Sequence, residues 1–271
     1  MKNKNLILNL FLAFALILFL QTSCNAPSGE TEEQTDTVAE VVHEEAHEVH
    51  WSYEGETGPE HWAEIVQDCS CGGTAQSPID LVGASKDKAL KALQLTYTAH
   101  DELEILNNGH SIQVNYPVGD FVIDGVKYSL VQFHFHAGSE HFIAGKQFPM
   151  EVHLVHVTPE NQIAVIGIMI AEGKENEFFK TFWADMPAEK AEEPVKKALA
   201  FDVNKMLPAK KNYYHYVGSL TTPPCTEGVK WFVMKNPIEA SAEQIAKISS
   251  LMPKNNFRPV QALNDRKIME F

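Results

Sequence analysis

The segment Tyr128–His136 constrains the fold most, because aliphatic and aromatic residues alternate with polar ones through its second half. Successive side chains of an extended strand point to opposite faces, so this pattern predicts a strand with Gln132, His134 and His136 on one face. The opposite, core-facing side then carries Val131, Phe133 and Phe135. A strand of this kind buries aromatic rings on one side and presents two imidazoles on the other.

Further short runs with a period of two surround this segment and are separated by turn signals such as Asp124-Gly125 and Ala144-Gly145. They cover Ser111–Tyr116, Phe121–Ile123, Pro149–Val157 and Ile163–Ile170. In later segments the apolar residues no longer repeat every two residues. Phe178, Phe179, Phe182 and Trp183 form one group, and Ile245, Ile248 and Leu251 have the spacing of one helical face. Ser241 and Gln244 form a plausible capping box before that face. The fold class predicted is mainly β with short peripheral helices (α+β), around a large mixed, mostly antiparallel central sheet.

The N-terminus is typical of an export signal, since basic residues precede an apolar run from Leu6 to Leu20. The run is shorter than the roughly 18–20 residues of a membrane-spanning helix. Small residues before Cys24 predict a lipoprotein-type signal peptide over residues 1–23 and a lipid on Cys24, although Gln21 replaces the usual apolar residue. The protein is then exported and lipid-anchored, in the periplasm or on the outer cell surface. An uncleaved N-terminal anchor is the alternative.

The next stretch, residues 24–50, is predicted to be an acidic disordered linker. It carries eight Asp or Glu residues and no Lys or Arg. These eight acids account for more than half of the formal net charge of −14. Residues 51–271 then fit one domain with a large core. No basic patch favours a nucleic-acid partner.

A third imidazole comes from Glu151-Val-His153-Leu-Val155-His156, where Glu151, His153 and Val155 share one face. Three imidazoles with one open position are typical of a catalytic zinc site, whereas structural zinc usually takes four ligands rich in cysteine. Gln132 and Glu151 each precede a ligand by two residues on the same face, where they can fix its second ring nitrogen.

The other histidines are interpreted differently. His156 faces away from the site and is predicted to be structural. His43, His47 and His50 lie in the acidic stretch, where solvation is favoured over loose metal binding.

These segments resemble the α-class carbonic anhydrases of bacterial type, and the resemblance covers residues 51–271. It rests on several motifs in the family's order, together with the two histidine segments: Trp51-Ser-Tyr53 through Gly58-Pro59-Glu-His-Trp62, Gln76-Ser77-Pro78-Ile79-Asp80, Asn107-Asn108-Gly109-His110, Gly218-Ser219-Leu220-Thr221-Thr222-Pro223-Pro224 and Asn256-Phe257-Arg258-Pro259.

The resemblance implies reversible hydration of carbon dioxide to bicarbonate and a proton, by attack of zinc-bound hydroxide, with Zn²⁺ on His134, His136 and His153. The main-chain carbonyl of Asn256 joins Gln132 and Glu151 as a partner of the ligands. Thr221 is similar to the threonine that accepts a hydrogen bond from the hydroxide, Glu140 to the glutamate that orients it, and His110 to the proton shuttle. Tyr53, Asn108, Gln113 and Thr222 then order water along the proton path, and the carbon dioxide pocket is lined by Val155, Val165, Leu220, Thr222, Val229 and Trp231.

Two features depart from the animal members of this family. The short segment His136–His141 is similar to the compact bacterial form, which reshapes the rim of the cavity. Gln113 stands where asparagine is common, which changes the detail of the water network.

Three cysteines follow Cys24, and in an exported protein this odd number predicts one disulfide and one spare thiol. The resemblance implies a bridge between Cys71 and Cys225, with Cys69 as the alternative partner of Cys225.

Two rival functions stay open from the sequence: a zinc-binding surface lipoprotein without catalysis, and a zinc esterase. No HExxH motif supports a peptidase. Whether the chain forms a homodimer also stays open.

Overall fold

The computed structural model describes residues 50–271, apart from the side chains of residues 181 and 185. The signal peptide predicted over residues 1–23, the lipid on Cys24, nearly all of the acidic linker, and His43 and His47 therefore lie outside the described residues. Within residues 50–271, no helix is both long enough and apolar enough to cross a membrane.

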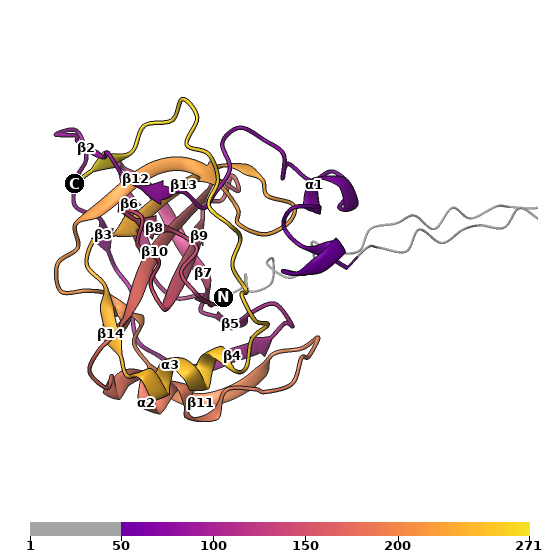
Figure 1. The fold of residues 1–271 in the computed structure, drawn as a ribbon. Coiled ribbons are helices and arrows are strands. Elements are labelled where there is room, and N and C mark those ends of the chain that lie inside the picture. Colours follow the sequence, from indigo (N-terminus) through magenta and orange to yellow (C-terminus); the bar gives the residue numbers. More distant parts are fainter. Residues whose placement is uncertain (1–49) are drawn as a thin grey trace, which may run out of the picture. The chain divides into compact units, whose positions relative to one another are not determined.

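The described chain consists of many strands and a few short helices (Figure 1). In chain order the elements are η1 (Gly55–Thr57), α1 (Trp62–Ile65), β1 (Asp80–Leu81), β2 (Ser85–Lys86), β3 (Gln94–Leu95), β4 (His100–Asn107), β5 (Ile112–Asn115), β6 (Asp120–Ile123), β7 (Val126–Ala137), β8 (Phe142–Ile143), β9 (Met150–Val157), β10 (Ile163–Glu172), α2 (Glu177–Phe182), η2 (Trp183–Asp185), β11 (Val195–Phe201), η3 (Val203–Met206), β12 (Tyr213–Ser219), β13 (Glu227–Met234), β14 (Ile238–Ala240), α3 (Ala242–Ser249) and β15 (Met269–Glu270). The five strands predicted from sequence all form, as β5, β6, β7, β9 and β10, with ends that differ by at most two residues.

One sheet of 13 strands dominates the described residues. Its main path runs β11-β4-β5-β7-β9-β10-β13-β12-β15-β2, with β14 beside β10, and with β6 joining β3 to β7. Most neighbours are antiparallel, but β10 pairs in parallel with β13 and β14, and β15 pairs in parallel with β2. The predicted mixed, mostly antiparallel sheet is therefore confirmed.

The face that β7 buries changes at Val131. Leu130 pairs with His156 and Gln132 with Val155, so Val131 is an extra residue without a partner on β9. Such a β-bulge shifts which residues point to each face. Tyr128 and Leu130 are buried before it, and Phe133 and Phe135 after it.

The prediction that Val131 shares a strand face with Phe133 and Phe135 is therefore wrong, since its side chain is 42% exposed whereas both phenylalanines are buried. The bulge still leaves both phenylalanines of β7 in the core. It also leaves His134 and His136 together on the opposite face, as the alternation predicted.

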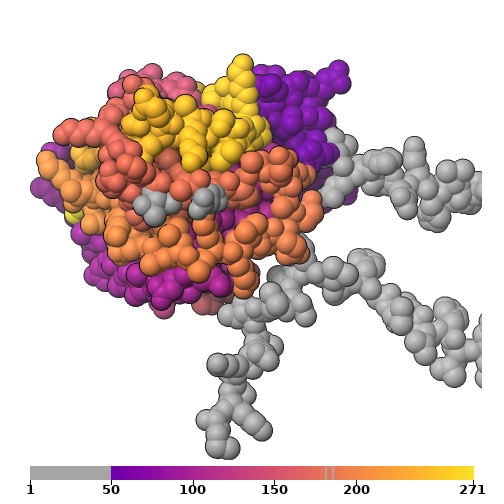
Figure 2. Space-filling model, turned by 90° about the horizontal axis from the view of Figure 1, so that it is seen from below, coloured from indigo at the N-terminus to yellow at the C-terminus, as the bar shows by residue number. Residues whose placement is uncertain are grey.

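Helices α2 and α3 lie together at one end of the sheet, near β11 (Figure 1). The predicted capping box is present, with the Ser241 side chain and Gln244 closing the first turn of α3. Gln244 also bonds to both backbone groups of Asn176, the N-cap of α2, at 2.8 and 2.7 Å. One polar side chain thus ties the two helices together. Residues from this later part of the chain, orange to yellow, occupy the centre of the face in Figure 2.

Candidate active site

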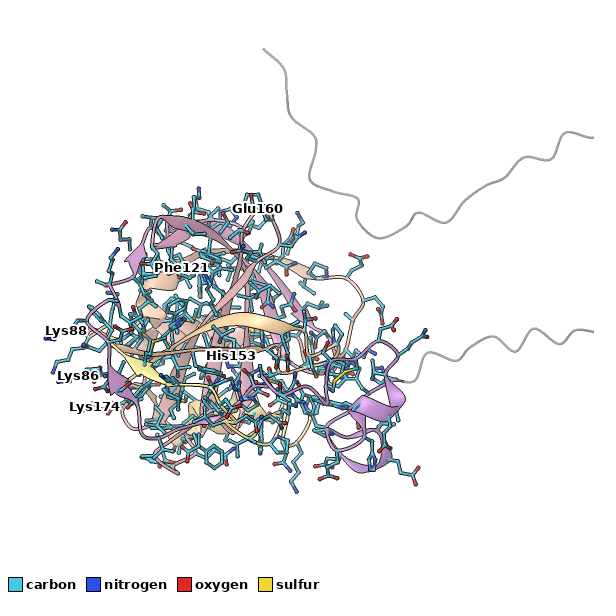
Figure 3. All side chains as sticks on the ribbon, turned by 90° about the horizontal axis from the view of Figure 1, so that it is seen from above. Lys86, Lys88, Phe121, His153, Glu160 and Lys174 are labelled. Carbon is cyan, nitrogen blue, oxygen red and sulfur yellow. A yellow bond between two sulfur atoms is a disulfide. The ribbon has the colours of Figure 1, made fainter. Side chains whose placement is uncertain are left out.

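Two neighbouring strands bring the three predicted metal ligands together. β7 and β9 are antiparallel with His134 directly opposite His153, and His136 lies two residues further along β7. Ring centroids are separated by 5.1 Å (His134 to His136), 5.3 Å (His134 to His153) and 4.6 Å (His136 to His153). One nitrogen from each ring lies within 4.8 Å of the others. Figure 3 shows His153 inside the body, away from the labelled lysines at its edge.

The outward nitrogens of two rings are held by hydrogen bonds. Nδ1 of His134 donates to Oε1 of Gln132 over 2.8 Å, and Nδ1 of His136 donates to the main-chain oxygen of Asn256 over 2.6 Å. With Nδ1 protonated, Nε2 of each ring carries a lone pair. Nε2 of His136 is buried and has no hydrogen-bond partner within the described chain. A metal ion would satisfy this lone pair, so the residues fit zinc.

The third ring, that of His153, is oriented by Glu151. Its Nε2 lies 2.9 Å from Oε1 of Glu151, which leaves Nδ1 to face the other two histidines. The same carboxylate accepts hydrogen bonds from the backbone nitrogens of Glu140 and His141, and from Nδ1 of His141, all at 2.9 Å. Gly167 lies opposite His153 on β10, and a Cβ there would come within 2.8 Å of Oε1 of Glu151. A glycine is therefore required for the carboxylate to fit.

The protonation of this cluster follows from burial and from its one central carboxylate. Burial lowers the pKa of His134 well below its ordinary value and also lowers the pKa of His136, against the opposing effect of Glu140. Burial disfavours charge on His153 as well, but Glu151 outweighs it and raises the pKa of this ring. The histidine neighbours of Glu151 likewise outweigh burial and hold its pKa well below the usual range. Two neutral imidazoles and an ionised carboxylate suit metal coordination, which needs deprotonated ligands.

A buried chain of hydrogen bonds behind Glu151 was not predicted from sequence. Nε2 of His141 lies 2.6 Å from the Tyr216 hydroxyl, which lies 2.8 Å from Oγ of Ser77. All three residues are fully buried. Position 141, next to a predicted catalytic glutamate, was the only signal that pointed to His141, and Ser77 appeared only as part of a family motif.

Glu140 lies against the ligands, but its predicted bond to Thr221 is absent. Its Oε1 accepts from the backbone nitrogen of Arg258 at 2.8 Å. Its Oε2 lies 3.5 Å from Nε2 of His136 and 3.8 Å from Nδ1 of His153, and has no hydrogen-bond partner in the described chain. The role assigned to Glu140 in orienting the Thr221 hydroxyl therefore stays a prediction.

An apolar wall adjoins the histidines. The pairings Val155↔Val165 and Val165↔Trp231 place these three residues in a row across β9, β10 and β13. Val155 lies two residues after His153 on the same strand face. The Trp231 ring is edge-on to the His153 ring at 4.8 Å. The predicted pocket residues Val229 and Leu220 belong to the same apolar cluster.

His110 lies among aromatic residues at the start of the described chain. Its ring stacks on Trp51 with 3.7 Å between centroids, and lies 6.2 Å from Tyr53 and 5.0 Å from His50. Burial, together with the nearby charges of His50 and Lys190, lowers the pKa of His110 to about 4. In this position the ring accepts a proton less readily than the reference imidazole, whose pKa is about 6.5.

The residues predicted to order water have mixed roles. Oδ1 of Asn108 accepts from the backbone nitrogens of His110 and Ser111, at 2.9 and 2.8 Å, so this amide shapes the turn that carries His110. Gln113 lies opposite His134 on β5 and donates to Asn115 at 2.9 Å. Burial raises the pKa of Tyr53 well above its ordinary value, with a smaller contribution from Glu140, so its hydroxyl stays protonated.

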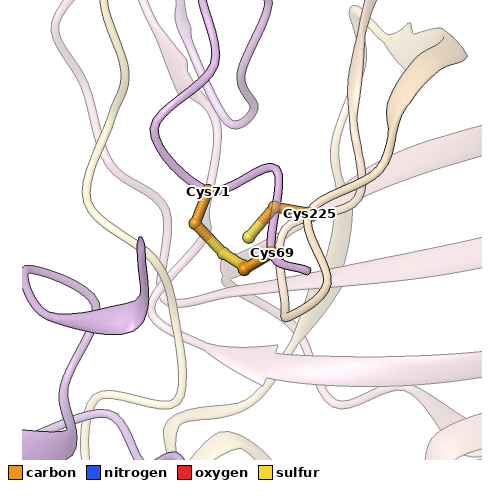
Figure 4. A group of neighbouring side chains, drawn as sticks. All are labelled: Cys69, Cys71 and Cys225. Atoms are coloured by element: carbon orange, nitrogen blue, oxygen red, sulfur yellow. A yellow bond between two sulfur atoms is a disulfide. The ribbon is translucent and has the colours of Figure 1, made fainter. Parts of the chain in front are cut away.

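The predicted disulfide between Cys71 and Cys225 is wrong in this structure. Cys69 is bonded to Cys71, and Cys225 is a buried free thiol (Figure 4). The physical reason is local: the turn that contains Cys69 and Cys71 brings their Cα atoms to 5.2 Å, within the range of a disulfide. The expectation of one bridge and one spare thiol among the three cysteines is confirmed.

Comparisons with known proteins show which proteins this chain resembles in sequence and fold. Residues 57–271 match the family model described as eukaryotic-type carbonic anhydrase. The carbonic anhydrase of Klebsiella pneumoniae is 42% identical over 226 residues, which cover 82% of this chain and 91% of the relative. The α-carbonic anhydrase of Thermovibrio ammonificans, solved with the inhibitor sulfanilamide, is 44% identical with a TM-score of 0.77, over 81% of this chain and 98% of that one. A hyperthermostable carbonic anhydrase from a hydrothermal vent chimney is 44% identical with a TM-score of 0.78, over 82% of this chain and all of that one.

The fold and the site define an enzyme with three histidines converging on one face of a large β-sheet, beside an apolar wall. The family model and the similar proteins identify the family within this class. The chain belongs to the carbonic anhydrase family, whose enzymes hydrate carbon dioxide.

Proposed function

We propose that this chain is a zinc-dependent enzyme that converts carbon dioxide and water reversibly to bicarbonate and a proton. One observation carries the proposal above the others. The nitrogens of His134, His136 and His153 converge within 4.8 Å, and the inward nitrogen of His136 is buried without a hydrogen-bond partner in the described chain. Zinc bound by these three nitrogens would supply a Lewis acid that makes water a nucleophile at neutral pH.

The apolar wall supports carbon dioxide as the substrate. Val165 and Trp231 are almost fully buried, and Val155 lies beside them on the strand that carries His153. Carbon dioxide has no net charge, so it can lie against such a surface without losing a charge–water interaction, whereas a charged substrate would be penalised. Leu220 and Val229 extend the same surface.

Thr221 and Glu140 would control the attacking oxygen. Thr221 is only 6% exposed and stands between Leu220, which belongs to the wall, and the turn closed by the Cys225 N–H and the Thr222 carbonyl at 2.8 Å. Its hydroxyl is proposed to accept a hydrogen bond from the attacking oxygen. Glu140, which accepts a hydrogen bond from the backbone nitrogen of Arg258, would accept a hydrogen bond from the Thr221 hydroxyl and so keep it in that orientation.

His110 would pass the product proton to solvent. Its half-buried ring has a low pKa beside Trp51, so a proton that reaches it there is released readily. Tyr53, which stays neutral, Gln113 and Thr222 are the polar groups proposed to order water between His110 and the histidine cluster.

Stopped-flow measurement of carbon dioxide hydration tests the proposal. The protein purified with zinc should hydrate carbon dioxide well above the uncatalysed rate, lose activity on dialysis against a zinc chelator, and regain it with one equivalent of zinc. Ester hydrolysis is measured on the same samples. Zinc binding without hydration would indicate a zinc-binding protein without catalysis. Ester hydrolysis without hydration would indicate a zinc esterase.

We also propose that the chain is exported and anchored to a membrane by a lipid on Cys24. The support is the order of basic, apolar and small residues that precede Cys24. Intact-mass analysis of the membrane fraction should show the mass of a chain that begins at a lipidated Cys24. A Cys24→Ser variant found in the membrane fraction at the wild-type level would contradict the proposal.

A further inference from the structure

The hydroxyl of Ser111 lies where the pairing between β5 and β7 ends. The last paired position of these strands is Gln113↔His134, two residues after Ser111 and one before Phe135. Beyond it, Oγ of Ser111 donates to the Phe135 carbonyl at 2.6 Å and accepts from the Phe135 backbone nitrogen at 3.2 Å. One buried side chain thus bonds to both backbone groups of Phe135, in the manner of the next hydrogen-bonded pair of an antiparallel ladder.

The two residues joined in this way are neighbours of functional groups. Phe135 stands between His134 and His136, two of the proposed metal ligands. Ser111 directly follows His110, the proposed proton shuttle. The hydroxyl therefore connects the turn that carries the shuttle to the peptide between two ligands.

The side-chain amide of Asn256 joins the same two segments. Its Nδ2 donates to the carbonyls of His110 and Phe135, both at 3.0 Å, and its Oδ1 accepts from the backbone nitrogen of Ala137 at 2.7 Å. Ser111 and Asn256 thus share the Phe135 carbonyl as an acceptor. We call these two residues the Ser111–Asn256 pair.

We propose that Ser111 is a positioning residue for proton transfer, whose hydroxyl holds the turn carrying His110 at a fixed distance from the three converging histidines. This inference rests on the proposed function, because it takes His110 as the proton shuttle and the converging histidines as the zinc site. Transfer through ordered water requires a fixed spacing of donor and acceptor, and a misplacement of about 1 Å in a catalytic arrangement can lower a rate by about 100-fold.

Strand β7 is held from its other side as well, whereas the turn is not. β9 pairs with β7 at Phe135↔Val152 and along the rest of the strand. The turn at His110 contacts β7 through the Ser111–Asn256 pair. Loss of the Ser111 hydroxyl should therefore displace the turn and leave the ligands on β7 in place.

Stopped-flow hydration of carbon dioxide by the zinc-loaded Ser111→Ala protein tests the proposal. Zinc content and kcat/KM should equal those of the wild type. In weak buffer kcat should fall by about 3–10-fold, a fraction of the loss expected when the acid–base group itself is removed, and added imidazole should restore it. A wild-type kcat in weak buffer would overturn the proposal. Parallel losses of zinc and kcat/KM would also overturn it, because they would mean that Ser111 supports the metal site instead.

NMR of the same proteins gives a readout that does not depend on turnover. The His110 ring stacks on Trp51 with 3.7 Å between centroids, so its carbon-bound protons should carry an upfield ring-current shift. In Ser111→Ala that shift should decrease toward the value of an exposed histidine, and an unchanged shift would overturn the proposal. If the zinc-loaded wild type does not hydrate carbon dioxide, the proposed function fails, and the NMR comparison alone decides whether Ser111 positions His110.

Met252→Leu is the matched control, because it alters the packing around the Ser111–Asn256 pair and keeps the hydroxyl. The Met252 sulfur lies 3.9 Å from Oγ of Ser111 and 3.5 Å from Nδ2 of Asn256. This variant should match the wild type in kcat and in the His110 shift. An equal decrease in Met252→Leu would assign the effect to packing and overturn the role of the hydroxyl.

Ser111→Cys is the second variant, for use if Ser111→Ala does not fold. A thiol is a weaker hydrogen-bond donor and acceptor than a hydroxyl, so kcat in weak buffer and the His110 shift should both decrease, by less than in Ser111→Ala. Wild-type values of both quantities in Ser111→Cys would overturn the proposal.

Discussion

The structure holds the three converging histidines, called the base of the site below, differently from His110, called its rim below. At the base, each of His134, His136 and His153 has a partner 2.6–2.9 Å from its outward nitrogen. At the rim, the His110 side chain makes no hydrogen bond among the described residues and is held by its stack on Trp51, with 3.7 Å between centroids.

This difference matches two different tasks. A metal site needs each ring in one tautomer and one orientation, which polar partners beside the outward nitrogens supply. A proton-transfer group must exchange its proton with solvent, so a half-buried ring held by stacking suits it better than one fixed on all sides. The same residue type therefore serves either task, according to what its second nitrogen contacts.

The largest effect is expected from removing a ring at the base. His136→Ala deletes the nitrogen that is buried without a partner, so the protein should bind zinc poorly and lose hydration activity by roughly a thousandfold or more. Zinc content after gel filtration and stopped-flow hydration are the measurements. His61→Ala, at a partly exposed histidine beside α1, is the control and should behave as wild type. A His136→Ala protein with full zinc and normal turnover would show that the base is not the metal site.

Removing a partner of the ligands should have the next largest effect. Glu151→Ala and Gln132→Ala should each weaken zinc binding by about 10–100-fold, because an unheld ring must be ordered when the ion binds. Glu151→Ala should be the worse of the two, since the Glu151 carboxylate also holds His141 and two backbone amides. Competition with a chromophoric chelator measures both affinities. Wild-type affinity in both variants would show that the partners of the ligand histidines do not contribute to zinc binding.

The sequence alone was sufficient to predict most of the base. The alternation of apolar and polar residues around His134 and His136 predicted a strand, and the same alternation placed Gln132 and Glu151 beside their ligands. His156, on the opposite face of β9, is fully buried and bonds to the Tyr97 hydroxyl at 2.8 Å, as its structural interpretation requires. These predictions succeeded because they depend only on the period of a strand.

Features that depend on long-range contacts could not be predicted in the same way. The bulge at Val131 depends on how β7 pairs with β9, and the chain from Glu151 through His141 to Tyr216 crosses between strands distant in sequence. The cysteine pairing failed for a related reason. The resemblance to known proteins favoured Cys225 as a partner, whereas the local turn places Cys69 within reach of Cys71.

At the rim, His110→Ala should leave the base intact and slow only proton release. Zinc content and kcat/KM should remain at wild-type values, while kcat in weak buffer falls by about 10–100-fold, since a positioned acid–base group typically contributes at least this much. Added imidazole should restore kcat by carrying the proton in place of the missing ring. An unchanged kcat in weak buffer would mean that protons leave the site by another route.

Trp51→Ala should have the smallest effect on turnover and should act on the pKa of His110. Burial is the largest cause of the low pKa, about 4, so uncovering the ring should raise its pKa toward 6.5. His50→Ala removes only a neighbouring charge and should raise the pKa less.

The low pKa of His110 also makes stability depend on pH. Because the native pKa lies below that of the unfolded chain, the unfolded state binds the proton first. The free energy of unfolding therefore falls as the pH drops from about 6.5 to about 4. Trp51→Ala should weaken that dependence. NMR titration of His110 and urea unfolding at pH 7 and pH 5 measure both effects, and an equal pKa in wild type and Trp51→Ala would show that stacking on Trp51 does not control this ring.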